Sequence, residues 1–320
     1  MNLSLIIPVY NEQDTLPHLF EAVYQTMNVL NQSWEVILVD DGSRDDSLSV
    51  LKEYAHKDAQ HIRVISFRRN FGQTAAIAAG LDYALGEIVI LLDADMQNDP
   101  ADIPMMLAKL DEGYDLVSGW RKSRKDNVIT RNLPSMIANW IISQVTGVHL
   151  HDYGCTLKAY RRDVLEGFRL YGEMHRFIPV FANSVGAKIT EVPVRHHARK
   201  YGKTKYGLER TAKVVLDLFT VKFLVSFSSK PIYLFGGTGA MLMIFSAIAM
   251  IYLLIRRIFF LVGVVGSPLF QMSGMFFILG FQSMLMGLIA ELLVRTYHES
   301  QRKTTYTIRT TVNLEQDPRD

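Results

Sequence analysis

The stretch that decides the fold is residues 88–97, which read IVILLDADMQ. Its first half is short, apolar and rich in β-branched residues, so it predicts a strand buried on both faces, as in a parallel sheet. If the backbone stays extended beyond it, the two-residue period puts Asp93, Asp95 and Gln97 on one side. Ligands of open α/β sheets bind at the carboxyl ends of strands, and carboxylate and amide oxygens suit Mg²⁺ or Mn²⁺. These three residues are therefore candidate metal ligands, and a solvated acidic turn is the alternative.

The same arrangement of a strand followed by polar residues precedes this stretch three times. Strands are predicted at 3–9, 35–39 and 62–67, and they run into PVYNE at 8–12, DDGS at 40–43 and NFGQ at 70–73. Helical patterns separate the strands, and further elements are predicted at 104–112 (helix), 115–120 (strand), 132–146 (helix) and 188–194 (strand). Strands that alternate with helices predict a doubly wound, Rossmann-like α/β domain with its polar motifs at one sheet edge.

Several classes of function are disfavoured by what the chain lacks. The first strand-to-helix turn has no dinucleotide fingerprint, and no Walker A lysine is present, which argues against a dehydrogenase and an ATPase. The net charge of +2 comes without a sustained basic stripe, so no nucleic-acid partner is expected. A single cysteine excludes an intramolecular disulfide framework and a four-cysteine zinc site.

The last third of the chain has the composition of a membrane segment. Residues 231–255 and 268–294 are each apolar and long enough to cross a hydrocarbon core about 30 Å thick. Arg256 and Arg257 are assigned to the short outer loop between them, although this runs against the positive-inside tendency. The start of the first helix and the end of the second are placed in the cytoplasm by flanking cations, which are Lys222, Lys230, Arg295, Arg302 and Lys303. The glycines of GGTG at 236–239 are predicted to pack these helices together.

These patterns divide the chain into four parts. They are an α/β domain at 1–207, an amphipathic juxtamembrane helix at 208–230, a transmembrane hairpin at 231–295 and a polar cytoplasmic tail at 296–320. The amphipathic helix carries cations that can meet anionic headgroups in the membrane interface. The first residues show no basic region and no cleavage site, so we expect no signal peptide and a soluble part on the cytoplasmic side of the inner membrane.

The four motifs PVYNE, DDGS, NFGQ and DADMQ, in this order, resemble those of family-2 glycosyltransferases of the GT-A fold. The resemblance covers about the first 210 residues and is greatest to the polyprenyl-phosphate branch, which includes dolichyl-phosphate mannose synthases, polyprenyl-phosphate glucosyltransferases and formamido-arabinose transferases. It implies a membrane-bound inverting transferase that moves a sugar from a nucleotide-sugar to undecaprenyl or dolichyl phosphate with Mg²⁺ or Mn²⁺. It also implies a homo-oligomer, with a tetramer possible.

The resemblance further implies roles for individual residues. The nucleotide-binding residues would be Pro8, Tyr10, Glu12, Asp41 and Asp93, while Asp95 and Gln97 would hold the metal. The phosphate-binding and acceptor-binding residues would be Arg121, Arg131, Arg199 and Lys205. Asp152 would lie near the acceptor, so the catalytic set is Asp95, Asp152 and Arg121.

Two departures from the mannose synthases bear on the donor. Gln73 stands where those enzymes usually have lysine, and DYGC at 152–155 differs from their corresponding segment. Both departures favour a UDP-sugar over GDP-mannose. Three other interpretations stay open. A processive polysaccharide synthase would need a Gln-x-x-Arg-Trp motif and more membrane spans, a nucleotidyltransferase would need no hairpin, and a non-enzymatic membrane scaffold would not need intact Asp93, Asp95 and Gln97.

Overall fold

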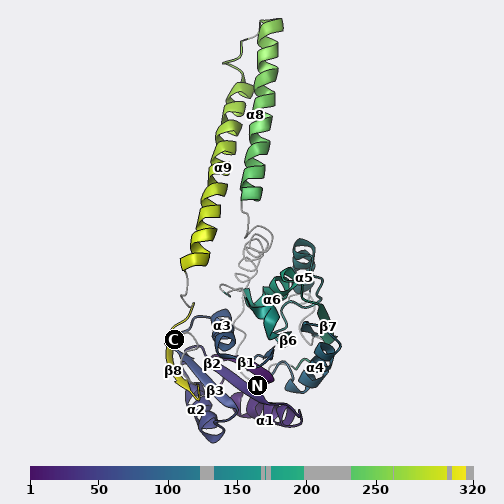
Figure 1. The fold of residues 1–320 in the computed structure, drawn as a ribbon, viewed down its shortest axis with the longest axis vertical. Helices are drawn as coiled ribbons and strands as arrows, with labels where there is room; N and C mark the ends of the chain where they lie inside the picture. The colour runs from purple at the N-terminus through teal and green to yellow at the C-terminus, as the bar shows by residue number, and fades with distance from the viewer. Residues whose placement is uncertain are drawn as a thin grey trace. The chain divides into compact units, whose positions relative to one another are not determined.

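The computed structural model describes residues 1–122, 133–166, 170, 174–197, 232–261, 263–300 and 305–314. The chain forms two compact units, residues 1–221 together with 304–320, and residues 222–303. We describe each unit by itself (Figure 1). The amphipathic helix predicted at 208–230 lies outside the described residues and stays a prediction.

The first unit is built on an eight-stranded sheet with the order β7-β5-β6-β4-β1-β2-β3-β8. Its strands are β1 Leu3–Val9, β2 Trp34–Asp40, β3 Ile62–Phe67, β4 Ile88–Leu91, β5 Leu116–Trp120, β6 Lys158–Arg161, β7 Ile189–Pro193 and β8 Ile308–Val312. Its α-helices are α1 Leu16–Met27, α2 Ser47–Lys57, α3 Gln73–Tyr83, α4 Ile103–Asp111, α5 Leu133–Thr146 and α6 Ile178–Ser184. Short 3₁₀ turns are η1 Pro100–Asp102, η3 Arg162–Leu165 and η4 Met174–Phe177. The predicted α/β architecture, in which strands alternate with helices over most of this unit, is confirmed.

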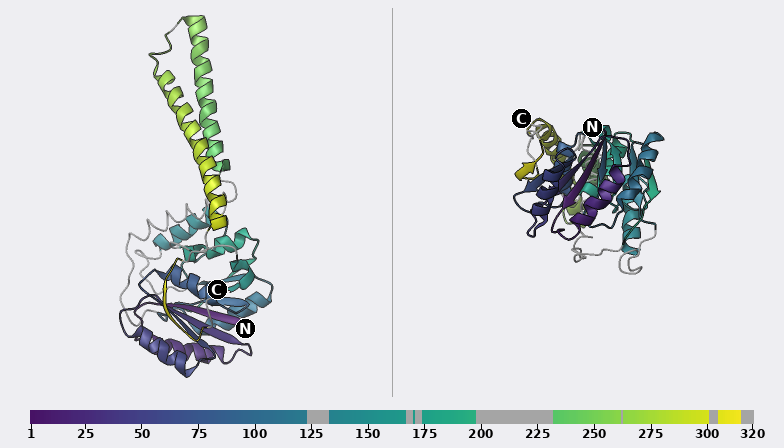
Figure 2. Two further views of the ribbon diagram at one scale, coloured as in Figure 1. Left: turned by 60° about the vertical axis from the view of Figure 1, so that its left-hand side comes forward. Right: turned by 90° about the horizontal axis from the view of Figure 1, so that it is seen from below.

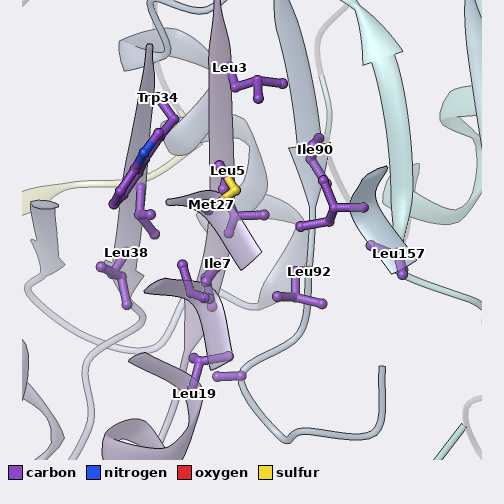
Figure 3. Close-up of a cluster of buried hydrophobic side chains, with 14 of the residues drawn as sticks. Leu3, Leu5, Ile7, Leu19, Met27, Trp34, Leu38, Ile90, Leu92 and Leu157 are labelled. Atoms are coloured by element: carbon purple, nitrogen blue, oxygen red, sulfur yellow. The ribbon is translucent and has the colours of Figure 1, made fainter. Parts of the chain in front are cut away.

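The core lies where the central strands meet the helices that cover them. β1 occupies the middle of the sheet, pairs in parallel with both β2 and β4, and is buried along almost its whole length. Leu5, Ile7 and Ile90 project from the sheet toward Leu19 and Met27 of α1 (Figure 3). This burial of apolar strands on both faces is what a parallel sheet requires, and it holds the polar strand ends in fixed register at one edge.

Two strands of the sheet were not predicted, and both are antiparallel. β6 lies between β4 and β5 and pairs antiparallel with each, and β8 pairs antiparallel with the edge strand β3. Both strands are short, and β6 begins with Lys158 and ends with Arg161, so neither produces a clear local pattern. β6 brings its first residue, Lys158, opposite Leu91 at the end of β4.

The structure corrects the prediction of a separate polar tail at 296–320. Residues 305–314 are described, and 308–312 form β8 of the main sheet. This segment, IRTTV, is rich in β-branched residues, which favour a strand. Its backbone pairs with the otherwise unpaired edge of β3. The tail prediction is therefore wrong for these residues.

The second unit is a helical hairpin of α8 Ile232–Phe260 and α9 Pro268–Ser300. These are the two long helices in the left view of Figure 2. Leu234–Phe260 and Pro268–Ala290 are long and apolar enough to cross a membrane. Most of their large apolar side chains are exposed. Arg256 and Arg257 lie in the last turns of α8, which corrects their assignment to the loop. Arginine is a good helix former, and the helix ends only where Leu261 takes a φ of 55°.

The predicted role of the GGTG glycines in packing is confirmed for Gly239. A Cβ added there would lie 2.5 Å from the backbone oxygen of Gly280, and one on Gly280 would lie 2.7 Å from that of Gly239. Hydrogen bonds also cross the hairpin, from Ser246 Oγ to the Ser273 oxygen at 2.7 Å and from Ser283 Oγ to the Phe235 oxygen at 2.8 Å. Such close backbone approach with hydroxyl bonds between helices is a packing mode of membrane helices.

Candidate functional site

The polar motifs that follow β1, β2 and β4 meet at one edge of the sheet, as the sequence predicts. β1 lies between the other two strands. The amide of Asp41 donates to the Val9 oxygen at 2.9 Å, and the amide of Leu92 donates to the Ile6 oxygen at 3.1 Å. Three of the predicted nucleotide-binding segments thus leave the sheet side by side. This edge is where α/β sheets of this kind carry ligands.

The loops after β1 and β2 are bonded to one another. The amides of Asn11 and Glu12 donate to Ser43 Oγ and Ser47 Oγ at 3.0 and 2.9 Å. In return, Asn11 Oδ1 accepts the amide of Arg44 at 2.8 Å. The Glu12 carboxylate accepts Thr15 Oγ1 at 2.6 Å. The two loops therefore support one another, and Pro8, Tyr10 and Glu12, which the resemblance assigns to nucleotide binding, are half-buried.

Asp41 organises the next loop, residues 68–72, which joins β3 to α3. Its two carboxylate oxygens accept the amides of Phe71 at 2.6 Å and Gly72 at 2.9 Å. Burial raises the pKa of Asp41 to about 6, although these two amides oppose the shift. Asp41 is thus placed beside the predicted nucleotide pocket, and its carboxylate holds the β3–α3 loop.

Gly42 is required for this arrangement, and Gly42→Ala provides a test. Gly42 has a φ of +69°, and a Cβ there would lie 2.5 Å from the backbone carbon of Arg69. Alanine would therefore strain its own backbone and displace the β3–α3 loop. We expect a loss of about 1–3 kcal/mol in the free energy of unfolding, together with weaker binding of the donor nucleotide. Denaturant unfolding and calorimetric nucleotide titration of the same variant measure the two effects. Unchanged values in both would contradict the role of Gly42.

Asp93 is held from two sides. Its Oδ1 accepts Gln73 Nε2 at 2.7 Å and its Oδ2 accepts Thr156 Oγ1 at 2.6 Å. Burial and then the charge of Asp95 raise the pKa of Asp93 above its ordinary value. Gln73, which the sequence marked as a departure, is thus a direct partner of a predicted nucleotide-binding residue. Thr156 was not predicted, because it reaches Asp93 only through the unpredicted packing of β6 against β4.

The segment after Asp93 turns instead of staying extended, which corrects the expected two-residue alternation. Met96 has a φ of 58°, and Asp95 Oδ1 accepts the amide of Gln97 at 3.1 Å. An aspartate that bonds the backbone two residues ahead favours a turn over a strand. Asp95 and Gln97 are therefore placed by this turn, and Asp95 is only 9% exposed.

The oxygen donors at this turn fit a divalent cation that would be bound partly by the protein and partly by a diphosphate. Within the described ranges no three His, Cys, Asp or Glu side chains gather as a closed metal cage. Mg²⁺ typically takes one or two carboxylates and completes its shell with substrate phosphates and water. Asp93 and Asp95 are close enough for the charge of one to raise the pKa of the other. A cation between them would relieve this repulsion.

Arg121 and Asp152 form a buried ion pair at the end of β5. Arg121 Nε and Nη2 donate to Asp152 Oδ2 and Oδ1 at 2.7 and 3.0 Å. Their side chains are 16% and 2% exposed. Burial alone would lower the pKa of Arg121, but the hydrogen bond and charge of Asp152 outweigh it and raise that pKa. Both oxygens of the Asp152 carboxylate therefore serve to orient the Arg121 guanidinium.

Two further cations, which were not predicted, lie beside this pair. Lys158 Nζ donates to the backbone oxygens of Tyr153 and Cys155, and burial followed by the charges of Arg121 and Arg176 lowers its pKa. Both arginines lie next to Gly154. A Cβ added to Gly154 would lie 3.3 Å from Arg121 Nη2 and 3.8 Å from Arg176 Nη1. Lys158 begins the unpredicted strand β6, and Arg176 belongs to a short 3₁₀ turn, so local periodicity signalled neither.

Residues 195–197, which come just before the phosphate-binding candidate Arg199, lie against the acidic turn. The amide of His197 donates to the Gln97 oxygen at 2.9 Å, and Arg195 pairs with Asp102 at 2.8 Å and with Asp99 at 3.2 Å. The remaining phosphate-binding candidates, Arg131, Arg199 and Lys205, lie outside the described residues and stay predictions.

The chain is similar to known proteins in its sequence and in its fold. Residues 4–168 match the family model described as glycosyl transferase family 2. The chain is 40% identical over 313 residues to a dodecaprenyl-phosphate galacturonate synthase of Rhizobium johnstonii, with 97% of this chain and 92% of that protein covered. It is 35% identical over 311 residues to an undecaprenyl-phosphate 4-deoxy-4-formamido-L-arabinose transferase of Klebsiella pneumoniae, with 97% and 93% covered.

A solved structure shares the fold. It is the glucosyl-3-phosphoglycerate synthase from Mycobacterium tuberculosis in complex with Mn²⁺, UDP and phosphoglyceric acid, at a TM-score of 0.52 and 18% identity. The alignment covers 70% of this chain and 78% of that one.

Proposed function

The chain belongs to glycosyl transferase family 2, and from that premise we propose that it transfers a sugar from a nucleotide-sugar to the phosphate of a polyprenyl phosphate lipid. Relatives aligned over nearly the whole chain are named as polyprenyl-phosphate sugar transferases, which supports this class of acceptor. A UDP-sugar is the proposed donor, because Gln73 replaces the lysine of the mannose synthases and bonds Asp93 directly.

The observation that carries this proposal is the meeting of opposite charges at one edge of the sheet. Asp93 and Asp95 follow β4, while Arg121 and Lys158 come from the neighbouring strands β5 and β6. Burial and the charge of Asp95 raise the pKa of Asp93, and the charges of Arg121 and Lys158 oppose this rise, so the acidic and basic groups interact electrostatically. A reaction that joins a nucleotide diphosphate with a second phosphate needs an acidic site for a divalent cation and a basic site for the other anion.

The residues proposed to hold Mg²⁺ or Mn²⁺ are Asp95 and Gln97, with Asp93 beside them. When bound, the cation would neutralise charge on the departing diphosphate. Asp93, fixed by Gln73 and Thr156, is proposed to contact the nucleoside. Pro8, Tyr10, Glu12 and Asp41 would form the rest of the nucleotide pocket.

The acceptor needs positioning more than activation. A phosphate monoester has a second pKa of about 6, so it is already a nucleophile at neutral pH without a strong general base. Arg121 is proposed to bind this phosphate, and Asp152 is proposed to orient Arg121 through its bidentate pair. Additional positive charge around the phosphate is proposed to come from Arg131, Arg199 and Lys205. Direct attack by the lipid phosphate would invert the anomeric carbon.

The hairpin explains how the acceptor is reached. A polyprenyl tail stays in the bilayer because each buried CH₂ contributes about 0.8 kcal/mol, so the enzyme has to lie at the membrane. We propose that α8 and α9 span the inner membrane and that the catalytic domain is cytoplasmic, with the segment at 208–230 in the interface. A homo-oligomer, including a tetramer, stays a prediction.

A donor panel tests the proposed function. The full chain, purified in detergent, is given undecaprenyl phosphate with UDP-glucose, UDP-N-acetylglucosamine, UDP-galacturonic acid, UDP-formamido-arabinose or GDP-mannose, each with Mg²⁺, Mn²⁺ or EDTA. We expect a lipid that carries one sugar from a UDP donor, inverted at its anomeric carbon, and no product with EDTA. Mass spectrometry and NMR of the lipid identify the product.

The other outcomes separate the alternatives. A lipid-independent polymer would indicate a processive synthase, and transfer that retains the configuration would contradict direct attack. No product from any donor, in a preparation that is folded by circular dichroism, would favour the non-enzymatic scaffold.

A further inference from the structure

The segment that leads into the C-terminal strand β8 carries a buried aromatic residue, Tyr306, which packs at the end of β3, beside the nucleotide motifs. Tyr306 is 4% exposed. Its hydroxyl donates to Asp82 Oδ2 of α3 at 2.6 Å. Its ring stacks on Phe67, the last residue of β3, with the centroids 5.1 Å apart and the planes 16° from parallel. A residue near the end of the chain is therefore packed between β3 and the helix that follows it.

From Phe67 the contacts continue into the β3–α3 loop. Phe67 meets Phe71 edge to face, with centroids 5.6 Å apart and planes at 84°. The amide of Phe71 donates to Asp41 Oδ1, and the neighbouring amide of Gly72 donates to Oδ2. A continuous series of contacts thus joins Tyr306 to the carboxylate proposed to line the nucleotide pocket.

The backbone of the C-terminal segment holds the same loop. The amide of Arg68, its first residue, donates to the Thr307 oxygen at 3.1 Å. The pairing of β3 with β8 shifts register between Ser66 and Phe67. Such irregularities bend a strand and redirect the side chains next to them. At the other end of β8, Asn313 Nδ2 donates to the backbone oxygens of Ala55 and Ile62 at 2.7 and 2.9 Å.

We propose that Tyr306 is a positioning residue of the nucleotide site, which fixes Phe67 and Phe71 so that the β3–α3 loop presents its amides to Asp41. The inference rests on the proposed function in taking Asp41 as part of the donor pocket. Tyr306 touches neither substrate. Its effect is confined to donor binding, because its contacts lead to Asp41 and Gly72, whereas the acceptor cations come from β5, β6 and η4.

The test compares Tyr306→Ala and Tyr306→Phe with Thr311→Ala, which changes an exposed residue of β8 in the same C-terminal segment. Aromatic pairs contribute about 0.5–1.5 kcal/mol beyond their buried area, which corresponds to about a 2-fold to 12-fold change in affinity. We expect Tyr306→Ala to raise the donor KM and the Kd of UDP with Mn²⁺ by such a factor, while kcat and the acceptor KM stay unchanged. Tyr306→Phe keeps the stack and should restore most of the affinity, and Thr311→Ala should match the wild type.

Hydrogen exchange on the full chain in detergent separates positioning from general loss of structure. In Tyr306→Ala the amides of Phe71 and Gly72 should lose protection, while those of β1 and β2 keep theirs. Unchanged protection at both amides, or an equal rise in the donor and acceptor KM, would overturn the proposal. Failure of the proposed function is a different result, since the wild-type protein itself would then neither bind UDP with Mn²⁺ nor transfer sugar.

Discussion

Asp95→Ala should reduce sugar transfer by about a thousandfold or more, since it removes a carboxylate from the electrostatic stabilisation of the leaving diphosphate. Asp95 is buried at a turn, where its side chain accepts a hydrogen bond from the Gln97 amide. It also lies close enough to Asp93 to raise the pKa of Asp93. Alanine leaves Asp93 and Gln97 without the second carboxylate that a divalent cation needs. Initial rates at saturating donor, with Mg²⁺ or Mn²⁺ titrated, measure the loss.

Asp95→Asn and Asp111→Ala make this prediction specific. Asparagine keeps an oxygen and the turn-closing hydrogen bond but loses the charge, so we expect partial activity at raised metal concentrations. Asp111 is an exposed acid at the end of α4, and its removal should have no effect. Full transfer by a folded Asp95→Ala protein would refute the metal site.

Asp152→Ala should both destabilise the protein and abolish transfer. It leaves Arg121 buried without its partner and close to Lys158 and Arg176. Removing one member of a buried ion pair typically costs about 3–5 kcal/mol. Transfer should be lost because the unpaired guanidinium no longer has a fixed orientation toward the acceptor phosphate. Denaturant unfolding of the full chain in detergent, followed by tryptophan fluorescence, gives the first quantity and the transfer rate gives the second.

The double substitution Arg121→Met with Asp152→Leu separates the two effects. An apolar pair of similar size should recover most of the stability, because no buried charge is left unpaired. It should recover no transfer, since Arg121 is proposed to bind the acceptor phosphate. If the double variant regained activity, Arg121 and Asp152 would be structural residues only. If Asp152→Ala were as stable as the wild type, the pair would contribute nothing to the fold.

The placement of the four polar motifs after strands was predicted correctly, because it depends on residues that are close in sequence. Each of the motifs at 8–12, 40–43, 70–73 and 93–97 directly follows a strand whose pattern is clear, and parallel pairing brings such ends to one edge. The expectation that the backbone stays extended through Asp93, Asp95 and Gln97 was wrong, because a hydrogen bond from the Gln97 amide to the Asp95 side chain closes a turn there.

Local periodicity and turn residues were thus enough to specify the alternating strands and helices, the polar edge, the metal-type donors and the two membrane-length helices, because these depend on residues a few positions apart. Only the tertiary structure decided which distant groups meet there: Thr156 on Asp93, Arg176 beside Arg121, and Tyr306 on Phe67. These partners are separated by tens to hundreds of residues and sit on short or antiparallel segments. The positions of Thr156 and Tyr306 follow from the pairing of β6 and β8 in the sheet, and that of Arg176 from the packing of η4. Local sequence patterns do not predict such long-range packing.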